Sequence, residues 1–558
     1  MSPSIASPLV PVSVPLTQNS YPQPVPPDAT IPEPQFPPTL PPPEELFPSP
    51  LPNSTPTEPD VEPSQTLVIE RFIFEGNTAF TDEKLAEITQ SFLNRPITFS
   101  ELLQARSAVT DLYVSNGYIT SGALIPPQTL EAGAVTIQIV EGEISELNIK
   151  GDEKLNSNYV RSRLKPALSK PLNQNRLLEA LQLLQLNPVI ATISAELSAG
   201  IRPGESILNV DFQTADTFTV RVFSDNSRPP SVGTFRRGVE VLEGNLFGQG
   251  DRFDAVYSNT DGSNIVDVSY DFPINSRNGT VGFYLNYTDS QVIESPFEDL
   301  EIEANSYTYE LRYRQPIIRT PQEELTLGLA LSRRETDTSI LGVGFPLSRG
   351  AENDGETRLS IVRFYQEYVN RGGKQVLAAR SQFSLGVGAL DATINNNDEP
   401  DSRYLAWRGQ AQWLRLLAPD MVLLIRSDIQ LSNEELIPLE QIGLGGFETV
   451  RGYRQDLLLR DNAAFASVEL RYPILRTSDG EGVLQLTPFV DLGRAWNANP
   501  ELEIDSRTLF SVGLGLRWQY SDRLTLRFDW GIPLSDTESR ERTLQEQGIY
   551  FSLDWNLF

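Results

Sequence analysis

The sequence has no cysteine and no histidine among its 558 residues. Without cysteine there are no disulfides, thiolate nucleophiles or zinc–sulfur sites. Without histidine there are no Ser–His–Asp or Cys–His catalytic arrangements and no imidazole metal sites. Because the chain carries 74 acidic residues, two carboxylates can come together by chance, so such a pair is weak evidence for glycoside hydrolysis. We therefore expect no enzyme activity, no cofactor and no metal site.

Positive charge and long apolar runs are also scarce. The formal net charge is −29, which argues against nucleic acid as a partner because phosphates would be repelled. No stretch approaches the ~20 consecutive apolar residues of a membrane-spanning helix. The first ten residues, "MSPSIASPLV", lack the basic start and apolar core of a secretion signal. These features fit either a soluble protein or a chain whose signal is not in this sequence.

Proline is concentrated at the amino end. Residues 1–65 hold 21 of the 42 prolines. Proline lacks an amide donor and disfavours helix at the preceding residue, so this segment cannot pack as a domain. We predict a disordered, polyproline-rich tether over 1–65.

Two similar units follow the tether. Residues 66–142 read as a strand, two helices and two strands, and residues 143–213 repeat that order. Each unit has about 75 residues, so tandem copies explain the pattern better than a single fold does. We predict two successive α+β domains with these bounds.

Helical patterns disappear over residues 214–558, where about 16 segments alternate between apolar and polar residues. In one of them, "SYTYELRYR", the apolar row is Tyr307, Tyr309, Leu311 and Tyr313, and the polar row is Thr308, Glu310, Arg312 and Arg314. The spacing is about 22 residues per strand and turn, which suits membrane strands of ~10 residues joined by loops.

The charged row decides which face is inside. Charges lie in the middle of strands, and burying them in a dry core would cost several kcal/mol each. The apolar row would make a very large patch if water covered it. A closed antiparallel barrel satisfies both rows, with apolar residues against lipid and charges around a wet lumen. We predict a 16-stranded transmembrane barrel; the alternative is a soluble β-sandwich. The chain ends on Phe558, and bacterial outer-membrane barrels commonly end on an aromatic residue, although Phe558 falls out of phase by one residue with the apolar row before it.

One long loop, near 434–462, is rich in glycine and is too long for a tight hairpin. It carries the sequence "VRGY", and about 40 residues later a strand carries "FVDLG". The candidate site residues are Val450, Arg451, Gly452 and Tyr453 in the loop and Phe489, Asp491 and Gly493 in the strand. The four letters of the loop motif, taken alone, are compatible with a surface loop whose arginines are solvated.

The two motifs, the duplicated units and the barrel together resemble the outer-membrane translocators of two-partner secretion. These form the TpsB family of haemolysin and filamentous-haemagglutinin exporters. The resemblance covers nearly all of residues 67–558 and identifies the duplicated units with POTRA domains. It implies a monomeric pore in the bacterial outer membrane, in contact with lipid, whose periplasmic POTRA domains bind an unfolded exoprotein for export.

The resemblance also implies roles for the motif residues. The loop would fold into the lumen, and Arg451 would pair with Asp491, so that the loop acts as a latch on the inner wall. A confined lumen favours such a bidentate ion pair. Family members can begin with a helix that plugs the pore, but the prolines of residues 1–65 disfavour that helix, so we do not carry the plug over.

Two rival functions remain. A barrel insertase of the same superfamily usually has more than two POTRA copies. A passive solute porin needs no periplasmic chain-binding domain. Export by two-partner secretion is therefore the function that we expect.

Overall fold

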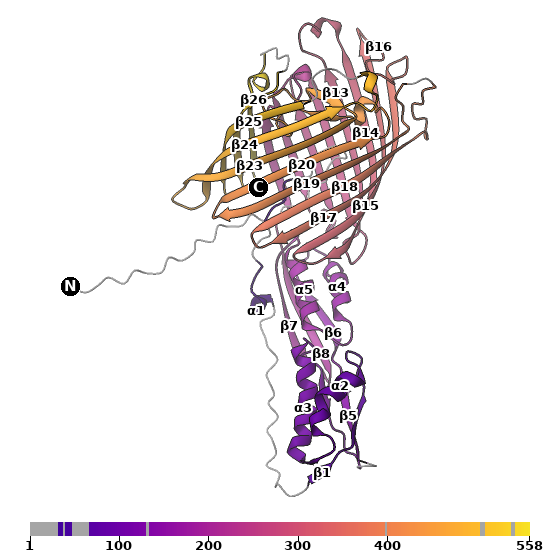
Figure 1. The fold of residues 1–558 in the computed structure, drawn as a ribbon, viewed down its shortest axis with the longest axis vertical. Coiled ribbons are helices and arrows are strands. Elements are labelled where there is room, and N and C mark those ends of the chain that lie inside the picture. Colours follow the sequence, from indigo (N-terminus) through magenta and orange to yellow (C-terminus); the bar gives the residue numbers. More distant parts are fainter. Residues whose placement is uncertain are drawn as a thin grey trace, which may run out of the picture. The chain divides into compact units, whose positions relative to one another are not determined.

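The computed structural model describes residues 32–36, 40–46, 66–129, 133–396, 399–502, 508–536 and 542–558 (Figure 1). Most of the predicted tether lies outside these residues. The chain divides into two compact units, Leu40–Asp216 and a second made of Met1–Thr39 with Thr217–Phe558.

The unit Leu40–Asp216 contains two αβ units in series. Its elements are α1 (Pro43–Leu46), β1 (Thr66–Val68), β2 (Arg71–Glu75), α2 (Asp82–Thr89), β3 (Pro96–Thr98), α3 (Phe99–Ser115), β4 (Gly122–Leu124), β5 (Ala134–Val140), β6 (Glu143–Lys150), α4 (Ser157–Leu164), α5 (Gln174–Gln185), β7 (Ile190–Ala199) and β8 (Glu205–Thr214). The second αβ unit has the predicted order of strand, two helices and two strands, whereas the first has β1 and β3 as additional strands.

Each αβ unit folds around a three-stranded sheet. In the first the strand order is β2-β5-β4, and in the second it is β6-β8-β7. The central strand runs parallel to the unit's first strand and antiparallel to the other. Apolar residues at helical spacing on α2 and α3, such as Leu85, Val109 and Tyr113, pack with Ile137 of β5 in a buried core.

The first predicted strand of this region is in fact two strands. β1 pairs with β3, whereas β2 pairs with β5. The chain changes partner at Ile69 and Glu70, where Ile69 is fully buried and the Glu70 amide donates to the Gly133 carbonyl. Apolar alternation alone did not reveal this change, because both halves fit the same period.

A buried carboxylate closes the first αβ unit. Glu141 accepts hydrogen bonds from the backbone amides of Thr78 at 2.6 Å and Ala79 at 2.8 Å, from the Tyr113 hydroxyl at 2.9 Å and from the Thr78 hydroxyl. Burial opposes ionisation of Glu141, but these donors outweigh it and hold the pKa of the carboxyl below its usual value.

The other unit is a closed antiparallel barrel. Its strands are β9 (Phe218–Asp225), β10 (Arg236–Glu243), β11 (Arg252–Asn259), β12 (Ser263–Pro273), β13 (Thr280–Gln291), β14 (Glu303–Arg319), β15 (Glu323–Ile340), β17 (Glu356–Gly372), β18 (Gln375–Val387), β19 (Tyr404–Ala418), β20 (Met421–Ser432), β23 (Asn462–Arg476), β24 (Gly482–Trp496), β25 (Thr508–Tyr520), β26 (Leu524–Pro533) and β27 (Ile549–Asn556), with β16 (Val343–Gly344) as a short pairing on β15. β27 pairs with β9 and closes the sheet, so the predicted 16-stranded barrel is confirmed.

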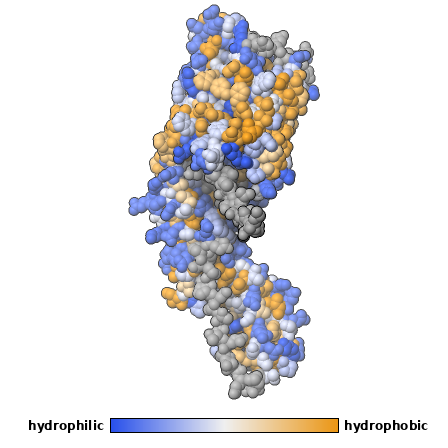
Figure 2. Space-filling view, turned by 90° about the vertical axis from the view of Figure 1, so that its left-hand side faces the viewer, coloured by the Kyte–Doolittle hydropathy of each residue, from blue (hydrophilic) through white to orange (hydrophobic). Residues whose placement is uncertain are grey.

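The two faces of the barrel wall divide as the alternation predicts. On β14, Glu310 is 4% exposed and its neighbour Leu311 is 51% exposed. On β26, Asp529 is 0% exposed and its neighbour Trp530 is 51% exposed. Figure 2 shows hydrophobic residues gathered over the barrel strands. The charged rows therefore face the interior of a closed sheet, and the soluble sandwich is excluded.

No helix in the described part of the chain is both long and apolar enough to cross a membrane. The last strand ends at Asn556, and Phe558 lies beyond it with 79% of its surface exposed.

The Glu141 contacts predict a pH dependence. A carboxyl whose pKa is lower in the folded than in the unfolded state stabilises the fold above its unfolded pKa, and this contribution is lost as the pH falls through the folded pKa. The protection of β5 amides, taken relative to the intrinsic exchange rate at each pH, should therefore fall at acidic pH more in the wild type than in Glu141→Gln. Equal acid sensitivity in both proteins would contradict the assignment.

The two faces also predict unequal tolerance to charge. Val490 lies near the middle of β24 and is 44% exposed on the outer face. Replacing it with arginine should lower the free energy of unfolding from bilayers by up to about 2–4 kcal/mol. Val490→Leu is the control and should change it little. If arginine were tolerated as well as leucine, this face would not contact lipid.

Candidate functional site

The long loop between β20 and β23 lies against the inner wall of the barrel. It contains a short hairpin of β21 (Ile442–Leu444) and β22 (Leu458–Arg460), which the sequence did not reveal. The hairpin packs apolar side chains into a buried cluster with the wall, made of Ile442, Leu444, Val450, Tyr453, Leu458, Ala463, Phe465, Ala495 and Leu509. The loop is thus an ordered part of the barrel interior.

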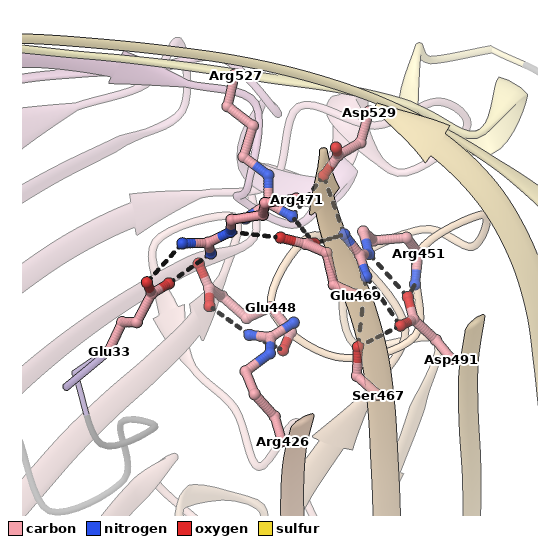
Figure 3. Close-up of polar contacts among 10 residues, drawn as sticks. All are labelled: Glu33, Arg426, Glu448, Arg451, Ser467, Glu469, Arg471, Asp491, Arg527 and Asp529. Atoms are coloured by element: carbon pink, nitrogen blue, oxygen red, sulfur yellow. Dashed lines mark hydrogen bonds and ion pairs between the residues drawn. The ribbon is translucent and has the colours of Figure 1, made fainter. Parts of the chain in front are cut away.

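Arg451 is the centre of this contact. Its side chain is fully buried and forks onto Asp491, with Nε to Oδ2 at 2.8 Å and Nη2 to Oδ1 at 2.9 Å (Figure 3). Its Nη1 also contacts Glu469 at 2.7 Å and Asp529 at 3.3 Å. We call Arg451, Glu469, Asp491 and Asp529 the Arg451 cluster. One guanidinium therefore ties the loop to three strands, β23, β24 and β26.

The spacing of the strand motif has a direct geometric cause. Residues two apart on β24 share a face, so Phe489, Asp491 and Gly493 all point at the loop. The Arg451 guanidinium lies 3.4 Å from the centre of the Phe489 ring, in a cation–π contact. A Cβ on Gly493 would lie 2.8 Å from a methyl carbon of Val450, so only glycine leaves room for the loop.

Gly452 brings the loop backbone close to the wall. Its φ of +103° is in the region that favours glycine, and its amide donates to the Tyr550 hydroxyl at 2.9 Å. A Cβ on Gly531 of β26 would lie 2.5 Å from the Gly452 nitrogen, so two glycines meet where the backbones touch. Close approach therefore requires glycine on both sides.

Tyr453 fixes the next position. Its hydroxyl donates to the Phe510 carbonyl at 2.8 Å and accepts from the Ser535 amide at 3.0 Å. Its ring is 2% exposed, so the side chain is buried with its polar end satisfied. The structure thus brings all seven candidate residues into one contact between loop and wall.

Sequence reasoning missed two members of the cluster. The alternation along "SVELRY" and "TLRFDW" is enough to place Glu469 and Asp529 on the charged face, but it gives no sign that both contact Arg451. Glu469 accepts in addition from Arg527 at 2.8 Å and Arg471 at 3.1 Å, so three guanidinium groups share it. The register of β23, β24 and β26 is needed to see this.

A second anchor of opposite sign holds the start of the loop. Glu440 accepts from Arg363 at 2.8 and 2.9 Å, from Arg334 at 2.8 Å and from the Tyr404 hydroxyl at 2.7 Å. These partners lie on β17, β15 and β19, and Arg363 is 1% exposed. An arginine fixes the loop to one set of strands and a glutamate fixes it to another.

The site is built from ion pairs, hydrogen bonds and packing contacts between the loop and the barrel wall. Among the residues that the structure describes, no three His, Cys, Asp or Glu side chains are placed to hold a metal ion. Each carboxylate of the Arg451 cluster is engaged by guanidinium groups. The arrangement holds the loop against the inner wall of the barrel.

Comparison with known proteins gives two family matches. The model of the haemolysin secretion/activation protein family ShlB/FhaC/HecB matches residues 204–518, which is more than half of the chain. The model of the ShlB-type POTRA domain matches residues 67–142, the first αβ unit.

Similar individual proteins are transporters. The heme/hemopexin transporter protein HuxB of Haemophilus influenzae is 22% identical over 464 residues, 79% of each chain. The outer membrane transporter CdiB of Dickeya dadantii is 22% identical over 408 residues, 72% of this chain and 71% of its own. In structure, CdiB from Escherichia coli matches with a TM-score of 0.68 at 19% identity, covering 91% of this chain and 93% of its own.

A barrel-assembly protein is similar in fold as well. BamA from Haemophilus ducreyi, lacking POTRA domains 1–3, matches with a TM-score of 0.55 at 14% identity, covering 88% of this chain and 100% of its own. At that identity the likeness concerns the fold alone.

Proposed function

Because the chain belongs to the haemolysin secretion/activation protein family ShlB/FhaC/HecB, we infer that it is an outer-membrane transporter of two-partner secretion. Its barrel spans the outer membrane, its POTRA domains lie in the periplasm, and it exports a partner exoprotein through the barrel. The observation that carries this function is the union of ShlB-type POTRA domain and family barrel in one chain.

We propose that the POTRA domains bind the exoprotein as an unfolded chain by strand addition. An extended segment can pair with a sheet edge through its backbone, without sequence-specific chemistry. In the first domain β4 pairs with only part of β5. Beyond β4, the Gln128 side-chain amide donates to the Thr136 carbonyl and accepts from the Thr136 amide, each at 2.8 Å. A side chain is easily displaced, so this edge of β5 offers backbone groups to an incoming strand.

We further propose that the loop is a latch and that the protein works as a monomer without a chemical step. The Arg451 cluster and the Glu440 anchor hold the loop within the lumen, where a passing chain needs space. Removing one partner from a buried ion pair destabilises a protein by about 3–5 kcal/mol, so release of the loop has to be compensated by other contacts. Export would therefore require an alternative arrangement of these charges.

Two other functions of the superfamily are less well supported. An insertase would share the barrel, but the BamA likeness concerns fold only, whereas the family model matches the exporters. A porin would not need POTRA domains.

Deletion of the gene separates the three functions. We expect one large protein to disappear from the culture medium, measured by quantitative proteomics of medium and envelope, and to return on complementation. Loss of many barrel proteins from the envelope would instead indicate an insertase, and unchanged proteins with altered solute uptake would indicate a porin.

Arg451→Ala tests the latch. The substitution leaves Glu469, Asp491 and Asp529 without their shared cation but removes no strand pairing. We expect a folded, heat-modifiable barrel in the membrane and loss of the exported protein from the medium. Arg451→Lys should rescue only in part, because lysine keeps the charge and loses the fork.

Arg460→Ala is the matched control. Arg460 lies in the same loop and donates to the Leu459 carbonyl at 2.7 Å, outside the Arg451 cluster. It should export normally. Normal export by Arg451→Ala as well would remove the latch role.

A further inference from the structure

A short proline-rich segment, Pro32–Phe36, belongs to the barrel unit. Its Glu33 carboxylate accepts from both terminal nitrogens of Arg471, Nη1 and Nη2, each at 2.6 Å (Figure 3). Arg471 projects from β23 into the lumen and is 5% exposed. The contact joins residues 438 positions apart and has the bidentate geometry of strong carboxylate recognition.

The wall around Glu33 carries an excess of positive charge. Arg517 of β25 donates to Gln485 at 3.2 Å and Gln519 at 2.7 Å, and among the described residues it makes no ion pair. Arg517 lies opposite Gln485 of β24, and Gln485 lies opposite Pro473, which is two residues along β23 from Arg471. Two guanidinium groups thus favour one carboxylate at this place.

The contact of the segment Pro32–Phe36 with the lumen wall has features that allow it to dissociate. Pro32 and Pro34 flank Glu33, and neither has an amide hydrogen, so neither can donate to a barrel strand. The side chain of Glu33 also keeps 41% of its surface exposed, so water can reach the ion pair. The Glu33 carboxylate thus provides a charged, bidentate contact between this segment and the barrel wall.

Glu469 connects this anchor to the Arg451 cluster. Arg471 Nε donates to one oxygen of Glu469 at 3.1 Å, and Arg451 Nη1 contacts the other at 2.7 Å. Five arginines face five carboxylates in this region: Arg426, Arg451, Arg471, Arg517 and Arg527 with Glu33, Glu448, Glu469, Asp491 and Asp529. Departure of Glu33 leaves one cation in excess, and Glu469 is the other carboxylate that Arg471 contacts among the described residues.

We propose that Arg471 and Arg517 form a carboxylate-binding site on the lumen wall, that Glu33 of the N-terminal segment is its resident ligand, and that release of Glu33 weakens the Arg451 cluster through competition for Glu469. The ligand class is an acidic side chain on an extended, proline-flanked segment. This inference concerns the resting barrel and does not depend on which exoprotein is exported.

The test uses the full-length protein in lipid bilayers without exoprotein, so that its outcome is separate from that of the export assays. The first measurement is hydrogen exchange at the amides of Arg451 and Gly452, which donate to Asp491 and to Tyr550. In Glu33→Gln we expect exchange at least about fivefold faster, the lower end of ordinary coupling between sites. Glu33→Asp should restore most of the protection.

The second measurement reads the segment itself. Since the chain has no cysteine, Pro32→Cys supplies a single thiol, and its reaction with a bulky polyethylene glycol maleimide reports exit from the lumen. Glu33→Gln should speed this reaction. Glu45→Gln, a matched neutralisation in the unit Leu40–Asp216, should change neither measurement.

Each contrary result overturns a definite part of the proposal. Equal thiol reactivity with and without the Glu33 carboxylate would show that Arg471 does not hold the segment. Faster thiol reaction with unchanged exchange at Arg451 and Gly452 would show that the site exists but is not coupled to the Arg451 cluster. A heat-modifiable band in every variant confirms that the barrel itself is intact.

Discussion

Lipid offers no hydrogen bonds to the backbone, and the organisation of the barrel follows from this constraint. Each strand must pair on both edges, so the sheet closes through β27 and β9. Closure gives every strand an inner and an outer face, and residues alternate between them. Charged residues such as Glu310 and Asp529 can then lie in mid-strand, because the inner face is kept from lipid. The loop that carries Arg451 depends on the same arrangement, since its partners are inward-facing side chains.

Charges confined in this way have to be matched by other charges. The loop between β20 and β23 places two buried charges beside charges of opposite sign: Arg451 lies among carboxylates and Glu440 lies among arginines. Because the two anchors have opposite sign and lie on different strands, a single change of charge in the lumen cannot strengthen both. Glycines at Gly452, Gly493 and Gly531 let the backbones approach closely enough for the ions to meet. Packing and electrostatics therefore support the same loop position.

The sequence predicts the parts of this structure that depend on local pattern. The alternation at residues such as Glu310 and Leu311 predicts strands, because the period of two is a local property of the chain. The charges in the middle of these strands then favour a closed barrel. The pairing of Arg451 with Asp491 came from the family resemblance. Contacts of Arg451 with Asp529, 78 positions away, and of Arg471 with Glu33, 438 positions away, depend on register and on the path of a separate segment. No short motif encodes either.

Glu469 shows why such a network can have discrete states. Its two oxygens accept from Arg451, Arg471 and Arg527 at the same time, so three guanidinium groups share one carboxylate. Removing or adding one carboxylate nearby changes which donor it favours, and a fork of two hydrogen bonds either forms or does not. Sharing a carboxylate between the loop and the wall makes the loop responsive to charges that do not contact it.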